Sequence, residues 1–81
     1  MDEPKRITVR QMRAGQSGKV VQVLGGPGLV NRLNSLGIRP GKQITKVSSV
    51  FLRGPVTIQI DRAQVAIGYG MSNRIVVEET Q

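Results

Sequence analysis

The segment Gly25–Gly41, with the sequence GGPGLVNRLNSLGIRPG, differs from the rest of the chain because its apolar residues recur with the period of a helix. Leu29, Leu33 and Leu36 are spaced by four and then three residues. At about 100° per residue they fall on one narrow stripe. The pattern predicts a helix of about nine residues over Gly28–Leu36, with the leucine stripe against the core.

The same segment also predicts where this helix begins and ends. Pro27 suits the first helical position, where its missing N–H costs nothing. Gly37 supplies the left-handed residue that commonly ends a helix. Leu33, Leu36 and Ile38 are expected to pin the helix to the rest of the domain, so that Leu36→Asp unfolds it. The complete structural motif consists of Gly26, Pro27, Leu29, Leu33, Leu36, Gly37, Ile38, Pro40 and Gly41.

The flanking sequence is rich in β-branched residues and is divided by Gly, Pro and Asp turns, which is typical of short strands. The predicted strands are Lys19–Leu24, Gln43–Val47, Val56–Ile60, Gln64–Ile67 and Arg74–Val77. Alternation turns the side chains of Val56, Ile58, Ile60, Val65, Ile67, Ile75 and Val77 inward. The fold class is therefore mainly β, a small barrel or sandwich of about five strands with one short helix inserted after the first.

One predicted strand breaks the alternation. Ile44 and Val47 lie three residues apart, so both can be buried only where the strand contains a bulge or bend.

The chain ends are polar. Residues 1–6 are predicted to be disordered, and Ile7, Val9 and Met12 suggest a short extended arm folded onto the domain. With a polar tail at residues 78–81, the predicted domain covers residues 7–77.

The amino-acid composition excludes most of the common kinds of catalytic site. The 81 residues include no His and no Cys, which excludes zinc sites built from thiolate or imidazole, disulfides, and Ser-His or Cys-His pairs. No signal peptide or membrane-spanning run is visible. The formal charge of +7 favours either simple solubility or attraction to an acidic partner such as nucleic acid.

Two motifs leave alternatives open. Gly25–Gly28 before a helix is either a phosphate-binding loop or a tight turn, and the motif lacks the residues of either common phosphate signature. A nucleic-acid surface would use basic residues that are spread along the chain, at Lys19, Arg32, Arg39, Lys42, Lys46, Arg53, Arg62 and Arg74.

Exposed aromatic or apolar side chains would mark a protein contact. Val50–Leu52 places three apolar residues before a turn, so one is either exposed or caps the barrel. Tyr69 is either a plug or a contact residue. From residue type and expected exposure, the candidate partner-binding surface consists of Arg32, Arg39, Phe51, Leu52 and Tyr69.

The ordered string Gly25–Leu29, Arg32-Leu33 and Leu36–Gly41 resembles the FeoA family of bacterial ferrous iron transport. The resemblance runs over roughly residues 7 to 77 and continues through Gly54–Val56 and Ile75–Val77. It implies an SH3-like barrel and a cytosolic accessory of the membrane transporter FeoB, whose cytoplasmic part carries a GTP-binding domain. A similar domain ends iron-dependent repressors, but this chain has no helix-turn-helix.

The expected function is therefore non-enzymatic: binding to the cytoplasmic region of FeoB and regulation of ferrous iron uptake. The alternative is a basic barrel that binds nucleic acid, with affinity that falls as salt rises. We expect no cofactor, with weak or transient divalent metal binding left open. The chain is expected to be cytoplasmic, a monomer or weak oligomer, recruited to the inner face of the membrane through its partner and not inserted in it.

Overall fold

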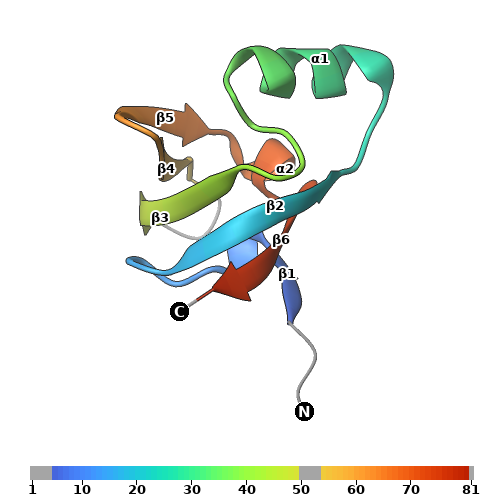
Figure 1. The fold of residues 1–81 in the computed structure, drawn as a ribbon. Coiled ribbons are helices and arrows are strands. Elements are labelled where there is room, and N and C mark those ends of the chain that lie inside the picture. The colour runs from blue at the N-terminus through green and yellow to red at the C-terminus, as the bar shows by residue number, and fades with distance from the viewer. Residues whose placement is uncertain (1–4, 50–53, 81) are drawn as a thin grey trace.

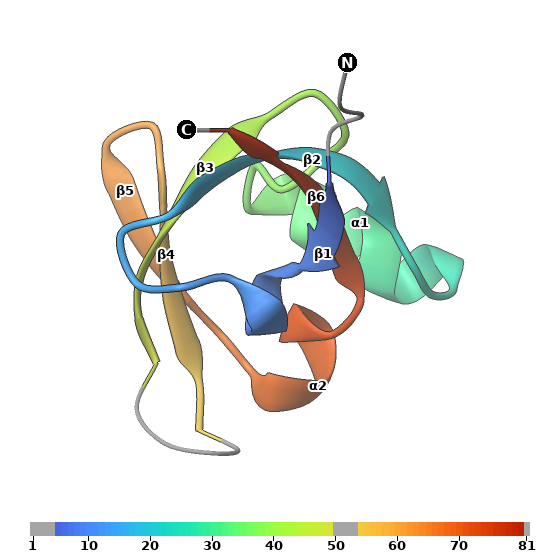
Figure 2. The same ribbon diagram turned by 90° about the horizontal axis from the view of Figure 1, so that it is seen from below.

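A computed structural model describes residues 5–49 and 54–80, which form one six-stranded antiparallel sheet with short helical segments (Figure 1). In chain order the elements are β1 (Arg6–Thr8), η1 (Val9–Gln11, a 3-10 turn), β2 (Ser17–Val23), α1 (Pro27–Ser35), β3 (Gln43–Ser49), β4 (Val56–Ile60), β5 (Ala63–Ile67), α2 (Tyr69–Ser72) and β6 (Ile75–Thr80). The sheet order is β1-β6-β2-β3-β4-β5, and the sheet curls around its core (Figure 2). The predicted mainly β fold, with α1 inserted after β2, is confirmed.

The sixth strand is the N-terminal arm. β1 pairs with β6, and the register places Arg6 opposite Glu78. The Glu79 amide donates to the Lys5 carbonyl, 2.9 Å away. Both strands therefore extend past the predicted domain limits of 7 and 77, because the charged residues at the two ends pair with each other across the ladder.

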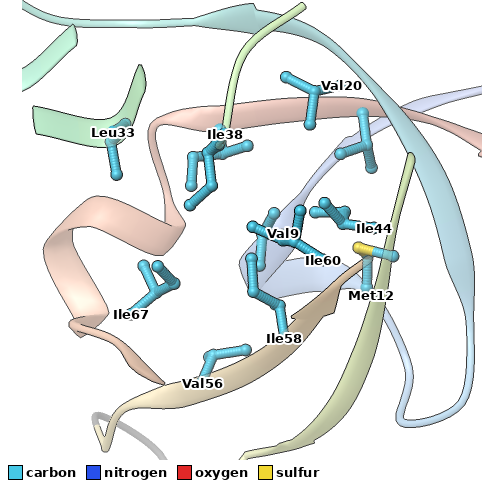
Figure 3. Close-up of a cluster of buried hydrophobic side chains, with 12 residues drawn as sticks. Val9, Met12, Val20, Leu33, Ile38, Ile44, Val56, Ile58, Ile60 and Ile67 are labelled. Carbon is cyan, nitrogen blue, oxygen red and sulfur yellow. The ribbon is translucent and has the colours of Figure 1, made fainter. Parts of the chain in front are cut away.

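The core is almost entirely aliphatic. Alternation in β4 and β6 buries the side chains that the sequence placed inward, and η1 and α1 add their own apolar residues. Figure 3 shows the cluster, which consists of Val9, Met12, Val20, Leu33, Ile38, Ile44, Val56, Ile58, Ile60, Ile67, Ile75 and Val77. Val65 is half-buried and packs against it.

The irregularity in β3 is resolved by a bulge. Lys46 pairs with Ile58 and Ser48 with Thr57, so Val47 has no β4 partner. Ile44 is buried, whereas Val47 is 37% exposed. The strand alternates normally up to the bulge, and it is Lys46 that points inward after Ile44.

The end of α1 forms a hydrogen-bonded turn that returns the chain to the sheet. The Gly37 amide donates to the Asn34 carbonyl, and the Ile38 amide donates to the Leu33 carbonyl, both at 2.9 Å. Gly37 has φ of +91°, the left-handed backbone that this Schellman turn requires. Leu33 and Ile38, the two residues that usually form the accompanying apolar contact, are both fully buried (Figure 3).

The predicted role of Leu36 is wrong. Pro27 does begin the helix, Leu33 is buried and Leu29 packs against the core, but Leu36 is 42% exposed. Leu36 is the residue at which the helix ends, and the turn at Gly37 directs Ile38 beneath α1 in its place. Leu36→Asp is therefore not expected to unfold the domain.

Substitution of the two leucines distinguishes the buried Leu33 from the exposed Leu36. Leu33→Ala should lower the free energy of unfolding by about 2–5 kcal/mol, because it opens a cavity in the core. Leu36→Asp should change it by less than about 1 kcal/mol, because the side chain already contacts water. Urea unfolding followed by circular dichroism measures both, and equal losses would contradict the exposed position of Leu36.

Two glycines of α1 and its turn should respond oppositely to alanine. Gly37→Ala should destabilise by about 1–2 kcal/mol, because a Cβ penalises the left-handed backbone. Gly28→Ala should stabilise by up to about 1 kcal/mol, because that position is helical and a Cβ there meets nothing within 4 Å. Thermal unfolding compares the pair, and a neutral Gly37→Ala would argue against the turn geometry.

Candidate partner-binding surface

We use the name α1 face for three exposed residues at the end of α1 and in the turn that follows it: Arg32, Leu36 and Arg39. Arg32 and Leu36 are four residues apart, and the backbone remains helical through Leu36, so their side chains share one side of the helix. Arg39 follows in the turn, where its carbonyl accepts from the Lys42 amide at 3.1 Å. The face combines two guanidinium groups with an exposed aliphatic side chain.

The part of the sequence that contains the α1 face carries only positive charges. The sequence has no Asp or Glu between Glu3 and Asp61. Each carboxylate in the described residues has a polar partner: Glu78 has Arg6 at 3.2 Å, Asp61 has Lys42 at 2.8 Å, and Glu79 has the side-chain amide of Gln16. Of these, only the Asp61–Lys42 pair lies near Arg39, and in that pair the Asp61 charge is offset by Lys42. The α1 face is therefore suited to an acidic surface on another molecule.

Tyr69 occupies a second position, at the start of α2. The guanidinium carbon of Arg10 lies 4.9 Å from the centre of the Tyr69 ring, the geometry of a cation–π contact. The Tyr69 carbonyl accepts from the Ser72 hydroxyl at 2.7 Å and from the Asn73 amide at 3.3 Å. Tyr69 is 38% exposed, so the ring is held in place while part of it remains in contact with solvent.

A buried lysine supports the η1 turn that carries Arg10. Lys46 is 3% exposed, and its Nζ donates to the carbonyls of Met12 and Arg10 at 2.6 and 3.2 Å. Burial and the nearby Arg10 charge lower the pKa of Lys46 below its ordinary value. The lysine thus links β3 to η1, and η1 places Arg10 over Tyr69.

The structure groups only some of the predicted contact residues. Arg32 lies on α1 and Arg39 in the turn after it, whereas Tyr69 lies on α2 and contacts Arg10 of η1; Phe51 and Leu52 lie outside the described residues. Sequence reasoning missed Leu36 as a surface residue, and Arg10 and Lys46 as supports of Tyr69. The burial of Lys46 could have been predicted, because Lys46 follows Ile44 by two residues and alternation places both side chains on the same face of the strand.

The same geometry reduces the basic surface that a nucleic acid could use. Lys46 is buried, Lys42 pairs with Asp61, and Arg53 lies outside the described residues. The remaining cations named for that alternative are exposed on separate elements: Lys19, Arg32, Arg39, Arg62 and Arg74.

One surface hollow of about 370 Å³ lies where β1, β6 and the segment before β2 meet. Its lining is mixed in charge and consists of Lys5, Ile7, Gln11, Arg13, Gln16 and Glu79. Within residues 5–49 and 54–80, no three His, Cys, Asp or Glu side chains come together as a metal site. In this part of the chain, no helix has the length and apolar character needed to cross a bilayer.

Several solved structures have the same fold. A crystal structure of an iron uptake regulatory protein, FeoA, is 32% identical, with a TM-score of 0.88 over 94% of this chain and 100% of the other. FeoA from Stenotrophomonas maltophilia, a prokaryotic SH3 domain protein complexed with zinc, is 22% identical, with a TM-score of 0.75 over 89% of each chain. A manganese-dependent transcriptional repressor is 21% identical, with a TM-score of 0.86 over 99% of this chain but 45% of the repressor. No curated protein matches the sequence.

These likenesses define the class: a small SH3-like β domain of the kind found alone in FeoA proteins and as part of larger repressors. The sequence model of the FeoA domain matches residues 7–79. The chain therefore belongs to the FeoA family, as the motif around α1 predicted.

The buried ammonium gives a pH dependence that can be measured. The unfolded lysine has its ordinary pKa near 10.5 and the folded one a lower pKa, so the unfolded chain binds more protons between these values. The contribution of Lys46 to stability should therefore rise with pH through this window, and its full penalty applies below it. Urea unfolding should show this slope in the unaltered protein and in Lys19→Met, an exposed control, and should lack it in Lys46→Met. Parallel curves for all three would contradict the prediction.

Proposed function

We propose that this FeoA-family protein is an accessory of ferrous iron uptake that acts by binding the cytoplasmic region of the FeoB transporter. The observation that carries the proposal is the FeoA domain match over residues 7–79. A role as a bacterial ferrous iron transport activating factor has been suggested for FeoA from Stenotrophomonas maltophilia, which supports the same role. On this proposal the chain works in the cytoplasm and reaches the membrane through its partner.

The proposed mode of action is binding without catalysis. The chain has neither His nor Cys, and its described residues bring together no set of metal ligands. The Stenotrophomonas protein forms a complex with zinc, but the described residues of this chain offer no group of three such ligands for the ion, and we propose that the protein acts without a cofactor. What the fold offers a partner is shape, positive charge and exposed apolar area.

The α1 face is the proposed contact with the transporter. Arg32 precedes Leu36 by one helical turn, Arg39 follows it by three residues, and Leu36 itself is 42% exposed. An arginine can bind a carboxylate through two parallel hydrogen bonds, and an exposed leucine adds apolar area at the centre of the contact. The partner surface is therefore expected to be acidic around an apolar depression. Neighbouring cations also speed association with such a surface and make it sensitive to salt.

A direct binding measurement tests the contact. Isothermal titration of the unaltered protein into the purified cytoplasmic region of FeoB should give a complex that weakens with salt. Arg32→Glu and Leu36→Asp should each raise Kd by about tenfold or more, whereas Arg13→Glu, an exposed arginine before β2, should change it by less than about threefold. Circular dichroism should show all three variants folded.

Three outcomes would contradict the proposal. The first is no complex with the transporter region at low salt, and the second is an equal loss in all three variants, which would indicate net charge rather than the α1 face. The third is tight, salt-dependent binding of RNA or DNA in place of the transporter, which would favour the nucleic-acid alternative.

A further inference from the structure

The two edges of the sheet are protected to different degrees. β1, at one edge, is three residues long and carries the Arg6–Glu78 ion pair. The ladder with β6 leaves the Thr8 amide facing outward, and this amide donates to the Gln11 side-chain oxygen at 2.9 Å. Short length, charge and side-chain capping are the usual means of preventing an edge from pairing with another chain.

β5, at the other edge, has none of these features. Its sequence, AQVAI, contains no charged residue and no proline. Its register with β4 is unbroken from Val56 opposite Ile67 to Ile60 opposite Ala63, so no bulge twists it away. Figures 1 and 2 both show β5 as the outermost strand beside β4.

The hairpin register identifies the free backbone groups. The turn between β4 and β5 has two residues, Asp61 and Arg62, and Asp61 has φ of +55°. In such a hairpin the residues that flank the turn exchange both hydrogen bonds, and alternate residues then face the partner strand. Gln64 and Ala66 therefore direct their amides and carbonyls away from β4. Both residues are exposed, and no backbone bond from elsewhere in the described chain reaches these groups.

We propose that the β5 edge binds an extended segment of another protein, which adds to the sheet as a seventh strand. Backbone bonds to Gln64 and Ala66 supply the attachment, as in other cases of strand addition. The outward side chains along the hairpin are small or uncharged, with Gln64 opposite Gln59 and Ala66 opposite Thr57. A segment with small or β-branched residues at its centre fits this surface.

The charges at the two ends of β5 determine which residues the bound segment should have at its own ends. Arg62 is exposed immediately before the strand, and Arg10 lies over Tyr69 two residues after it. Asp61, the acidic neighbour, is paired with Lys42. Five residues of strand span about 17 Å. The best-matched segment therefore has carboxylate residues about that far apart at its two ends.

The same charges disfavour a second copy of this chain as the occupant. An antiparallel copy that places Gln64 opposite Ala66 of its mate brings Arg62 opposite Gly68, beside the Arg10–Tyr69 pair. Two such encounters of like charge, between molecules that each carry +7, oppose the dimer. An acidic segment has no such repulsion.

Hydrogen exchange and a synthetic peptide test the proposal without the transporter. The probe is the capped peptide Glu-Glu-Val-Thr-Val-Glu-Glu, added to the isotope-labelled protein. In the free protein the Gln64 and Ala66 amides should exchange quickly, and those of Val65 and Ile67 slowly. A saturating amount of peptide should slow exchange at Gln64 and Ala66 by about tenfold or more.

Matched peptides and variants distinguish strand addition from other binding. Two peptides, N-methylated at the odd or at the even positions, should differ in affinity, because only one of these two sets of amides faces β5. The peptide that retains the amides facing β5 should still bind. Ala66→Pro should stay folded, because the Ala66 N–H that it removes is not bonded to β4. This variant should lose the peptide-induced slowing of exchange at Gln64, whereas Ala66→Thr should keep it. If Ala66→Pro does not fold, the two methylated peptides decide alone.

The proposal is overturned if the peptide leaves exchange at Gln64 and Ala66 unchanged, or if both methylated peptides bind equally. It is also overturned if protection at these amides rises with protein concentration in the absence of peptide, because the occupant would then be a second copy. A probe with lysines in place of its glutamates should bind at least about tenfold more weakly at low salt, and equal binding would remove the charge argument.

Discussion

The hydrogen bond from the Ile38 amide to the Leu33 carbonyl is the contact on which the position of α1 depends. The chain leaves the sheet at Val23 and returns to it at Gln43, and the helix between them has nine residues. A helix of that length is not stable alone in water. It persists because Leu33 enters the core and the turn at Gly37 places Ile38 beside it. Burial of this pair fixes which side of α1 faces the core, and Arg32 and Leu36 remain exposed near the end of the helix.

The buried Lys46 fixes the position of the N-terminal arm through hydrogen bonds, as Leu33 and Ile38 fix the position of α1 through apolar packing. The sequence has one Phe, one Tyr and no Trp, so it has few large side chains to fill space beneath the N-terminal arm. A buried ammonium is costly unless its donors are satisfied. The Met12 and Arg10 carbonyls satisfy two of them and belong to the arm itself. Lys46 therefore specifies where η1 lies against β3, and through η1 it determines the position of Arg10 over Tyr69.

The sequence predicted most of the fold because most of the fold is local pattern. Alternation in Val56–Ile60 and the Pro27 and Gly37 boundaries each depend on neighbouring residues, and each agrees with the structure. Leu36 was misplaced because the helical stripe was assumed to be buried along its whole length, whereas the turn at Gly37 brings Ile38 into the core in place of Leu36. Its exposure depends on Ile38, which competes for the same core space.

The candidate surfaces were harder to predict, because they depend on which distant residues meet. Arg32 and Arg39 are close in sequence, and both are exposed. The contact between Arg10 and Tyr69 joins residues near opposite ends of the chain. That β5 lies at an edge follows from the strand order, in which β1 and β6 pair instead with each other. No local pattern in AQVAI separates an edge strand from a central one.

The size of the molecule bears on how the two proposed surfaces would be used. The accessible surface is 5359 Å², and a standard interface takes about 800 Å² from each partner, roughly a seventh of this total. Neither three residues of the α1 face nor one strand edge supplies that area alone. A partner that held both a folded acidic surface and an extended acidic segment could engage the two sites together. The second contact would then form at the high effective concentration set by the first, so two weak sites would give one firm attachment. Such an arrangement requires no reactive group, which agrees with a chain whose polar side chains are used for support and for charge.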